Sequence, residues 1–598
     1  MTESIVFIYN EGQINQLKDL LRHKPMKVVC ISESLYPILK DGRISFTEIN
    51  DYKTIKPIEE IQYESFTISE TWYKSIEKEF LIDGISIFEC IERDIFNFIH
   101  PVIKYIDIVE NVLKDENPMY VYVFGYNDLI TSIITDVCIV NKVNVVYQRN
   151  NFMAVKYLFI KNIKPLVLFV ADIAAGFKRK YSHTGRDKNI NNTNIDILGV
   201  GIYPMNFESI EKKYSLCFAC VEYNPIVNRE WEIAKNINTP CFPIEKYWCI
   251  SDVFKSIKYI AKFNKLSKNE SNLMKYKHYN LIKYVMKNYI YYFTIQRSIM
   301  KGAEFISSSQ RIVKKLNPRI IIVPYDRTVA QRAVIEVGKK HNIPSVMIQH
   351  GVAHSHVGTS KMVADIYAVY GETSKKAYVE VGYDPNRVKV VGIPKYDLII
   401  RKVKRYNKEE LCRKFGIDPD KKIILYISGP FPKSEYYLYF EGIKKAFDYV
   451  RKHIDSTLIV KLHQLEHIYQ VKDIIKEQVN TKLFKYEDTW ELLYISDVVI
   501  TVMSTAVLEG LIINKPAIMI DPLNKYDDPY TRDEAAIKIK DFELLSEAIS
   551  NVLTGRTKIP NENIERCVYN LAYKVDGKST ERLVELISSI ISDKNTLK

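Results

Sequence analysis

Long apolar runs are missing from this sequence of 598 residues, since no stretch reaches the roughly 18 apolar residues typical of a membrane-spanning helix. The nearest candidate, KPLVLFVADIAAGF, is short and contains Asp172. The first ten residues, MTESIVFIYN, also lack the pattern of a secretory signal peptide, which is a basic region followed by an apolar core and a small-residue cleavage site. We therefore expect a cytoplasmic protein that neither spans a membrane nor carries an export signal.

Metal-binding patterns are equally scarce. The nine cysteines are scattered, and no second pair at zinc-ribbon spacing follows the C-x-x-C pair of Cys217 and Cys220. His350, His354 and His356 lie close together, but residues 349–358 include no carboxylate that could complete a metal site. We expect reduced thiols, no metal and no cofactor.

Positive charge is present in excess. Lysine and arginine number 85 while aspartate and glutamate number 72, which leaves a net charge of +13. An excess of this sign favours anionic partners such as nucleotides, phosphorylated lipids or nucleic acid. The length exceeds what one hydrophobic core accommodates, so two or more domains are expected.

The amino-terminal half alternates between strand and helix patterns. IVFIYN and KVVCIS flank a helical pattern at residues 11–23, and YVYVFGYND and VNVVYQ flank another at residues 130–142. Residues 85–113 are apolar at helical spacing. The alternation predicts parallel crossovers and an α/β class. Residues 150–250 contain short apolar runs but no motif that indicates a function.

Residues 253–316 combine lysines with aromatic residues. These are Lys255, Lys258, Lys262, Lys265, Lys268, Lys275, Lys277, Lys283 and Lys287, with Tyr276, Tyr279, Tyr284, Tyr289, Tyr291, Tyr292 and Phe293. The pattern predicts long helices whose lysines either form a solvated face or bind an anionic membrane surface or a lipid-linked acceptor. No RNA- or DNA-binding module accompanies them, so a nucleic-acid partner is not expected.

From residue 317 onward, strand and helix patterns alternate at short intervals. PRIIIVPYD, PSVMIQHG, ADIYAVYG and RVKVVGIPKYD predict four strands, with helical patterns at residues 330–342 and 373–382. His350 and Gly351 end the second strand, and so are expected at the carboxyl edge of a parallel sheet, where ligands bind. A histidine there can act as a general base, and a glycine lets the backbone approach a ligand.

A second sheet is predicted after the basic segment at residues 401–416. Lys461 and His463 end its strand TLIVKLHQ, and residues 497–521 have a strand-loop-helix-strand pattern. Ser504 and Thr505 would begin that helix, either as ordinary caps or as part of a phosphate site made by unpaired N–H groups and the helix dipole. A histidine at the ligand edge of each half predicts a site in a cleft between two domains.

Five motifs follow one another in the second half, namely QHG, GIPKYD, KLHQ, ELLYISDVVITVMSTAVLEGLIINKPAIMID and DGKSTERLVELI. In this order the chain resembles the GT-B nucleotide-sugar transferases of bacterial surface polysaccharide synthesis. The nearest groups are the CDP-glycerol glycerophosphotransferases that polymerise teichoic acids and the capsule polysaccharide transferases, and the UDP-N-acetylglucosamine 2-epimerases share the architecture.

The resemblance implies an α/β fold of the GT-B type, with two Rossmann-like domains around a cleft. We predict residues 1–400 as the acceptor domain, enlarged by a basic helical insertion at residues 253–316. Residues 401–575 would bind the nucleotide donor, and residues 576–598 would form a carboxyl-terminal helix.

The resemblance also assigns roles to the candidate residues. His350 would be the base that activates the acceptor hydroxyl, and His463 would contact the donor phosphates. Ser504 and Thr505 would cradle the donor diphosphate, while Glu509 would hold the ribose hydroxyls.

Lys461 and Gly351 complete the predicted donor site. Arg327 is a further candidate for offsetting the negative charge of the leaving diphosphate. The sequence departs from the family's pattern at two places. Gln464 stands where a proline usually follows the second histidine, and Val502 and Met503 stand where an aspartate is common before the serine pair.

Three functions remain open at this point. The first is a metal-independent glycosyltransferase or glycerophosphotransferase that uses a UDP-, CMP- or CDP-linked donor and a glycan or lipid-linked acceptor, at the inner face of the cell membrane. The second is a nucleotide-sugar 2-epimerase, which would need no acceptor. The third is a non-catalytic protein that binds an anionic polymer through its basic surface.

Overall fold

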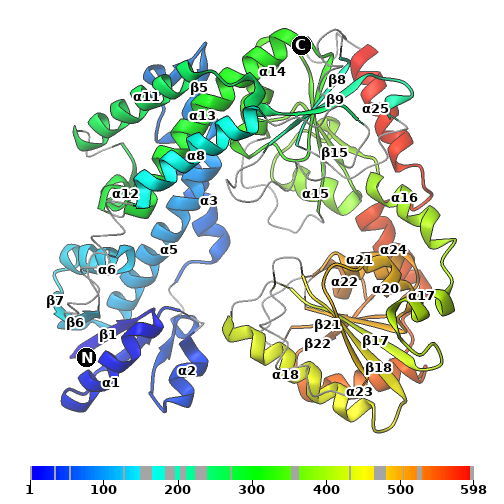
Figure 1. Cartoon of the computed structure of the whole chain (residues 1–598). Helices are drawn as coiled ribbons and strands as arrows, with labels where there is room; N and C mark the ends of the chain where they lie inside the picture. Colours follow the sequence, from blue (N-terminus) through cyan, green and yellow to red (C-terminus); the bar gives the residue numbers. More distant parts are fainter. Residues whose placement is uncertain are drawn as a thin grey trace.

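Three parallel β-sheets organise the computed structural model of the chain (Figure 1). The structure describes residues 3–32, 35–52, 55–124, 128–148, 164–181, 195–201, 210–221, 239–269, 273–287, 289–351, 362–429, 433–463, 466, 480–502, 504–521 and 528–592. We call the sheets A, C and E in chain order. Among the described residues, no helix is long and apolar enough to cross a bilayer.

Sheet A occupies the start of the chain, in the order β3-β2-β1-β6-β7. Its strands are β1 (Ser4–Ile8), β2 (Lys27–Cys30), β3 (Thr47–Glu48), β6 (Tyr120–Phe124) and β7 (Asn144–Gln148). Helices α1 (Ile14–His23) and α6 (Leu129–Val140) provide two of the crossovers. The predicted βαβ units at both ends of residues 1–148 therefore belong to one sheet, because β6 pairs with β1.

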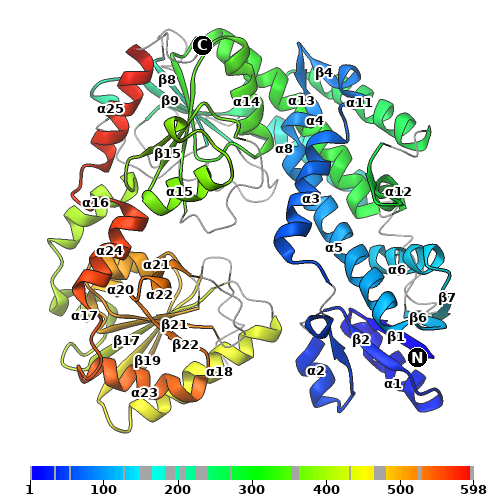
Figure 2. The ribbon, with the colours of Figure 1, turned by 180° about the vertical axis from the view of Figure 1, so that it is seen from behind.

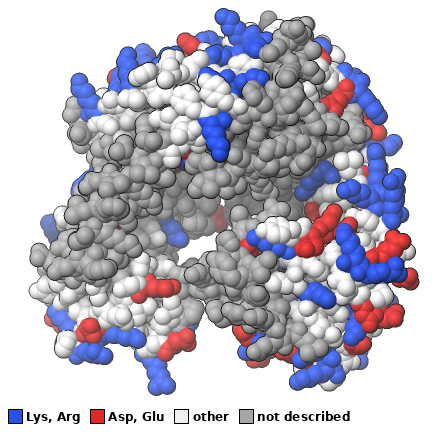
Figure 3. Space-filling view, in the orientation of Figure 1, with Lys and Arg blue, Asp and Glu red and all other residues white. Residues whose placement is uncertain are grey.

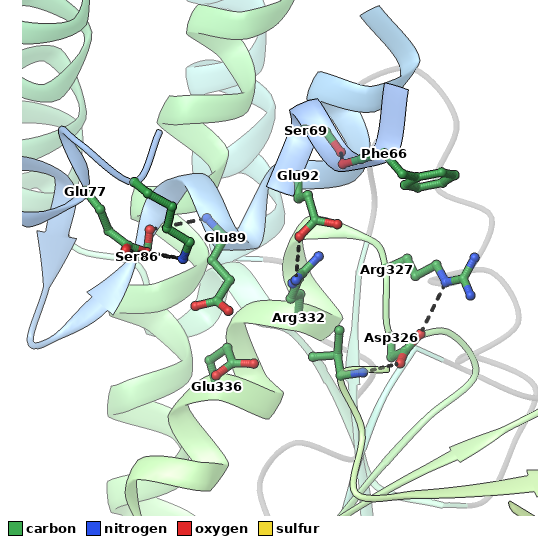
Figure 4. Close-up of polar contacts among 12 residues, drawn as sticks. Phe66, Ser69, Glu77, Ser86, Glu89, Glu92, Asp326, Arg327, Arg332 and Glu336 are labelled. Atoms are coloured by element: carbon green, nitrogen blue, oxygen red, sulfur yellow. Dashed lines mark hydrogen bonds and ion pairs between the residues drawn. The ribbon is translucent and has the colours of Figure 1, made fainter. Parts of the chain in front are cut away.

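A layer of helices leads from sheet A to sheet C. It contains α3 (Ile58–Thr71), α5 (Glu92–Glu116), α11 (Ile250–Asn269) and α13 (Tyr289–Leu316). Helix α5 is joined to α14 (Val329–Lys340) by an ion pair of 2.8 Å between Glu92 and Arg332 (Figure 4). Both side chains are only 3% exposed, so each needs the other to offset the desolvation of its charge.

The basic aromatic segment is part of this layer, and a separate insertion at residues 253–316 is not confirmed. Its tyrosines Tyr276, Tyr279 and Tyr284 are buried, at 5%, 3% and 1% exposure. The Tyr276 hydroxyl donates to Glu64 of α3, and the Tyr279 hydroxyl donates to Glu110 of α5. The side chains of Lys268, Lys287, Tyr289, Tyr291 and Tyr292 lie outside the described residues.

Sheet C contains the strands predicted from residue 317 onward and three earlier ones, in the order β10-β9-β8-β13-β14-β15-β16. They are β8 (Ile197–Val200), β9 (Leu216–Cys220), β10 (Cys241–Pro243), β13 (Ile320–Val323), β14 (Ser345–Ile348), β15 (Ile366–Val369) and β16 (Val388–Val390). Their short apolar runs are buried on both faces, as parallel strands between helices require.

Sheet E has the order β19-β18-β17-β20-β21-β22. Its strands are β17 (Lys422–Ile427), β18 (Ser456–Lys461), β19 (Thr481–Phe484), β20 (Val498–Thr501), β21 (Ala517–Ile520) and β22 (Ile537–Ile539). The strand order reverses between β17 and β20, so the topological switch point lies where β20 leads into α21 (Ala506–Ile512).

The chain then returns from sheet E to sheet C through α24 (Asn561–Ala572) and α25 (Ser579–Ser592), which runs beside sheet C in both views (Figures 1 and 2). Leu583, Ile587 and Ile591 of α25 pack into the core of sheet C. The Asp397 carboxylate, on α16 (Pro394–Val403), accepts hydrogen bonds from the first two backbone N–H groups of α25, at 3.1 and 2.6 Å.

These observations confirm the predicted α/β class with two Rossmann-like units, which are those of sheets C and E. Residues 1–400, predicted as a single Rossmann-like unit, contain two separate sheets. The physical reason is that the helical layer stands between sheets A and C, so their strands do not pair. The predicted domain boundaries themselves remain predictions.

We predict that Asp397→Ala destabilises the protein by about 2 kcal/mol or more, since a buried carboxylate loses two charged hydrogen bonds and α25 loses its cap. Differential scanning calorimetry would measure this as a lower Tm. The control is Asp541→Ala, which removes a single cap bond at the exposed start of α23 (Phe542–Leu553) and should cost about 0.5–1 kcal/mol. Equal shifts in Tm for the two variants would contradict the role given to Asp397.

Candidate active site

His350 stands at the carboxyl edge of sheet C, directly after β14, as the sequence predicts. Its side chain is exposed, and its ring packs edge-on against Tyr325 with the ring centroids 4.1 Å apart. Tyr325 follows β13, the neighbouring strand. The backbone of adjacent parallel strands thus brings an imidazole and a phenol ring together at one edge.

Gln349 fixes the backbone that carries His350. Its buried side-chain amide accepts a hydrogen bond from the Tyr370 N–H at 2.9 Å, and it donates to the Gly351 carbonyl at 2.6 Å and to the Ser374 hydroxyl at 3.0 Å. Gly351 has no need of a left-handed conformation, and a Cβ there would meet no atom of the described residues within 4 Å.

Asp326 holds the neighbouring loop after β13. Its carboxylate accepts hydrogen bonds from the backbone N–H groups of Val363 and Ala364, at 3.1 and 3.3 Å, and from the Tyr367 hydroxyl. Arg327 lies 3.9 Å from the same carboxylate, and Figure 4 shows the two side chains side by side. Arg327 is therefore engaged with Asp326 in this structure.

Lys395 and Tyr396 reach from the sheet C unit to a carboxylate of the sheet E unit. The Lys395 ammonium lies 3.9 Å from the Glu509 carboxylate, and the Tyr396 hydroxyl donates to the same carboxylate at 3.0 Å. Glu509 belongs to α21, which begins at the carboxyl edge of sheet E, whereas Lys395 and Tyr396 follow β16 of sheet C. The two carboxyl edges therefore meet at this contact.

His350 is accessible to water, but the packing of its ring on Tyr325 removes part of its hydration, and Lys395 adds a positive charge nearby. Desolvation, and then the Lys395 ammonium, hold the pKa of His350 below its ordinary value of 6.5, so the ring is neutral at neutral pH. Burial raises the pKa of Glu509, and Lys395 opposes that rise. A neutral imidazole beside a cation is able to accept a proton while the cation stabilises an anion.

Ser504 and Thr505 lie at the switch point of sheet E, at the start of α21. The Ser504 hydroxyl accepts a hydrogen bond from the Ala506 N–H at 3.2 Å, which is the contact of an ordinary helix cap. Thr505 is exposed and its side chain makes no cap bond to α21. Both residues are close in sequence to Glu509 on the first turn of the same helix.

Lys461 and His463 end β18, the strand beyond β17. The Lys461 ammonium donates to the Lys485 carbonyl at 2.5 Å and lies 3.5 Å from the Leu462 carbonyl. The His463 side chain is exposed, and its backbone N–H donates to Glu466, which also accepts from the Ser428 hydroxyl at 2.7 Å. Glu466 thereby ties the ends of β17 and β18 together.

The structure thus brings Glu509 together with Lys395 and Tyr396, and Lys395 is near enough to His350 to lower the pKa of its imidazole. Lys395 and Tyr396 lie in the motif GIPKYD, but a single lysine and tyrosine after a strand carry no sequence signal of a site. Among the described residues, the hydrogen bonds of the Lys461 ammonium go to the Leu462 and Lys485 carbonyls and not to His350. His354, His356, Gln464 and Met503 lie outside the described residues.

The surface has two further depressions, and the side chains were also compared with the needs of a metal site. A groove of about 760 Å³ lies between α15 (Glu372–Glu380) and the residues Pro529, Arg532, Asp533 and Asn570, and it contains none of the predicted site residues. The space-filling view is hollowed between the unit of sheet A and the unit of sheet E (Figure 3). Among the described residues, no group of three or more His, Cys, Asp or Glu side chains could hold a metal ion.

Comparisons with known proteins place this geometry in context. The chain is 25% identical over 263 residues to the processive diacylglycerol beta-glucosyltransferase of Bacillus licheniformis, which covers 42% of this chain and 64% of that protein. It is also 25% identical over 241 residues to the teichoic acid poly(ribitol-phosphate) polymerase of Bacillus spizizenii, covering 37% of this chain and 36% of that protein. The chain therefore spans less than two thirds of the length of these relatives.

Solved structures resemble the chain at low sequence identity. The UDP-GlcNAc 2-epimerase of Neisseria meningitidis matches at 14% identity and a TM-score of 0.43, over 66% of this chain and 100% of that chain. A wall teichoic acid polymerase matches at 15% identity and a TM-score of 0.40, over 73% of this chain and 98% of that chain.

A protein-family model extends over a continuous and larger part of the sequence. The model described as CDP-Glycerol:Poly(glycerophosphate) glycerophosphotransferase matches residues 253–589. This match begins in α11 and includes His350, the motif GIPKYD, all of sheet E and most of α25. Because it covers more than half of the residues, the chain belongs to the CDP-glycerol:poly(glycerophosphate) glycerophosphotransferase family.

Proposed function

We propose that the chain transfers glycerophosphate from CDP-glycerol, or a sugar from a UDP- or CMP-linked donor, to a hydroxyl group of a glycan or lipid-linked acceptor. The observation that carries the proposal is the contact of the two carboxyl edges. His350, a base that is neutral at neutral pH, lies near the Lys395 ammonium, which also reaches Glu509 of the opposite unit. Family membership makes CDP-glycerol the first donor to test.

The proposed reaction uses His350 as the general base. Its imidazole accepts the proton of the acceptor hydroxyl while that oxygen forms a bond to the donor phosphorus, or to the anomeric carbon of a sugar donor. The bond from that atom to the oxygen of the departing nucleotide breaks, and the nucleotide leaves with the electron pair. Lys395 and the backbone N–H groups at the start of α21 would offset the charge that develops.

The remaining predicted residues would hold the donor. Ser504, Thr505 and His463 would contact its phosphates, and Glu509 would accept hydrogen bonds from the ribose hydroxyls. Lys461 would keep the end of β18 in place, because its ammonium is already used by two carbonyl oxygens. We propose a metal-independent reaction, since the cation and the helix start can supply positive charge at the diphosphate.

The proposal predicts acceptor-dependent nucleotide release that chelation leaves unchanged. Purified protein would be incubated with CDP-glycerol and a panel of UDP- and CMP-sugars, with and without a teichoic acid primer, and in the presence of EDTA. Release of nucleotide only with acceptor supports transfer. Conversion of a donor without acceptor would favour the epimerase, donor binding without turnover would favour a non-catalytic protein, and loss of activity in EDTA would rule out metal independence.

We predict that His350→Ala lowers kcat by about 10²–10⁴-fold, the usual contribution of a positioned general base, while the affinity for the donor changes little. Steady-state kinetics and calorimetric titration with donor measure the two quantities. The matched control is His453→Ala, since His453 is an exposed histidine after α18 (Lys433–Val450) that packs on Tyr449. Full turnover in the His350 variant would refute its assignment as base.

The pH dependence provides a separate prediction. A base works in its neutral form, so the lowered pKa of His350 places the acid limb of kcat/KM below pH 6.5. Lys395→Gln removes a neighbouring positive charge, which raises the pKa of His350 and moves the limb to higher pH. The measurement is a pH–rate profile of both proteins, and a limb that stays in place or moves down would contradict the link between Lys395 and the base.

A further inference from the structure

Helix α5 carries a stripe of cationic and aromatic side chains along one side. Its four members, at spacings of three or four residues, are Arg93, Phe96, His100 and Lys104. The Phe96 ring stacks on Phe66 of α3 with the ring centroids 3.8 Å apart, and the His100 ring stacks on Phe96 at 5.4 Å. The stripe therefore combines positive charge with a firmly packed aromatic layer.

Arg93 forms no ion pair within the described part of the chain. Its guanidinium is half-buried and lies over the two phenylalanine rings, 5.7 and 4.9 Å from their centroids. The adjacent carboxylates are used by other groups, since Glu92 pairs with Arg332. Asp94 accepts a hydrogen bond from the Ser298 hydroxyl. Because a guanidinium stays charged, Arg93 is a cation that an anionic ligand could pair with.

A second arginine stands close to Arg93. Arg327 follows β13, two residues after Tyr325, and its charge adds to desolvation in lowering the pKa of Arg93. Figure 4 shows Arg327 and Phe66 on the same side of the ion pair that joins α5 to α14. Two like charges repel each other, so their proximity costs free energy that a bound anion would offset.

Arg327 keeps hydrogen-bond donors for a ligand. Its guanidinium is 3.9 Å from Asp326, beyond the length of a hydrogen bond, and it also reaches the Tyr383 hydroxyl. The Asp326 carboxylate already accepts from two backbone N–H groups and from the Tyr367 hydroxyl. One further carboxylate, Glu70 of α3, acts on the Tyr383 hydroxyl. A guanidinium has five N–H donors, so Arg327 can still donate to two oxygens of one phosphate.

We propose that Arg93 and Arg327 together bind a phosphate group of the acceptor at the edge of sheet C that carries His350. Arg327 belongs to the same loop as Tyr325, whose ring packs on His350, so the pair and the proposed base share one edge. The donor phosphates are assigned to α21 of the opposite unit, which leaves this pair to the acceptor. The inference rests on the proposed transfer reaction and names its acceptor as a phosphate ester.

The pair joins two parts of the chain. Arg327 lies within the family match at residues 253–589, whereas Arg93 lies outside it. The ion pair of 2.8 Å between Glu92 and Arg332 fixes the two parts against each other, one residue away from Arg93. The amino-terminal region would thus take part in selecting the acceptor, with a phosphate ester preferred over a neutral glycan.

The test compares two acceptors in steady-state kinetics, a soluble glycerol phosphate oligomer and a lipid diphosphate that carries a neutral disaccharide. We expect Arg93→Ala and Arg327→Ala to raise the KM of the acceptor about 10- to 100-fold, the loss of a charged hydrogen bond, while kcat and the KM of the donor change little. The acceptor that shows the change identifies the source of the phosphate. Arg93→Lys, which keeps the charge, should recover part of the loss.

The matched control is Arg319→Ala. Arg319 precedes β13, at the opposite end of the strand from Arg327, and it pairs with Asp196 at 3.4 Å. This variant should keep the KM of the parent for both acceptors. Partial recovery by Arg93→Lys separates the charge of Arg93 from its packing on the rings, and the Tm of each variant shows that it is folded.

Binding without turnover separates this inference from the proposed reaction. Calorimetric titration with the glycerol phosphate oligomer needs no donor, and the affinity of the parent should fall as salt is added. Weaker binding by the alanine variants, about tenfold or more, supports the site even if no donor is turned over. Equal affinity of the parent and both alanine variants for both acceptors, or a loss confined to CDP-glycerol, would overturn the proposal.

Discussion

The largely buried carboxylate of Glu509, whose side chain is 12% exposed, is the constraint on which the arrangement of the two halves depends. It lies on the first turn after the switch point of sheet E, and both of its described partners, Lys395 and Tyr396, come from the other half. A buried carboxylate without a cation or hydrogen-bond donor costs several kcal/mol, so the contact favours the state in which the two carboxyl edges meet. The relative position of the sheets is thereby coupled to the charges at the site.

The first turn of α16 contacts both sheet E and α25. Lys395 and Tyr396 reach toward sheet E, while the next residue, Asp397, caps α25, the helix that returns to sheet C. Gly392, just before this turn, adopts φ +87°, and a Cβ there would lie 2.4 Å from the Ser579 hydroxyl. A side chain at that position would separate α25 from the turn. The motifs GIPKYD and DGKST are thus two sides of one contact, which explains why both recur in the resemblance.

Most strands of the three sheets could be predicted from the sequence because short apolar runs bounded by turn residues are a local signal. The strands β3, β10 and β22 were not predicted, because two or three residues are too few to give that signal. The placement of His350 followed in the same way, since the end of a parallel strand defines an edge. Lys395 could not be found, because its role depends on a carboxylate more than a hundred residues later in the chain. The partners of Tyr276 and Tyr279 could not be found for the same reason: only the fold reveals that Glu64 and Glu110 accept hydrogen bonds from their hydroxyl groups.

Tertiary contacts at the edges of sheets C and E bring Lys395, Tyr396 and Glu509 together. The family match begins at residue 253, so sheet A lies outside it. Sheet A is nevertheless joined to the rest through α5, whose Glu92 is buried against Arg332 of α14, the helix that follows Tyr325 and precedes His350. A shift of α5 would therefore displace α14 in the unit that carries His350.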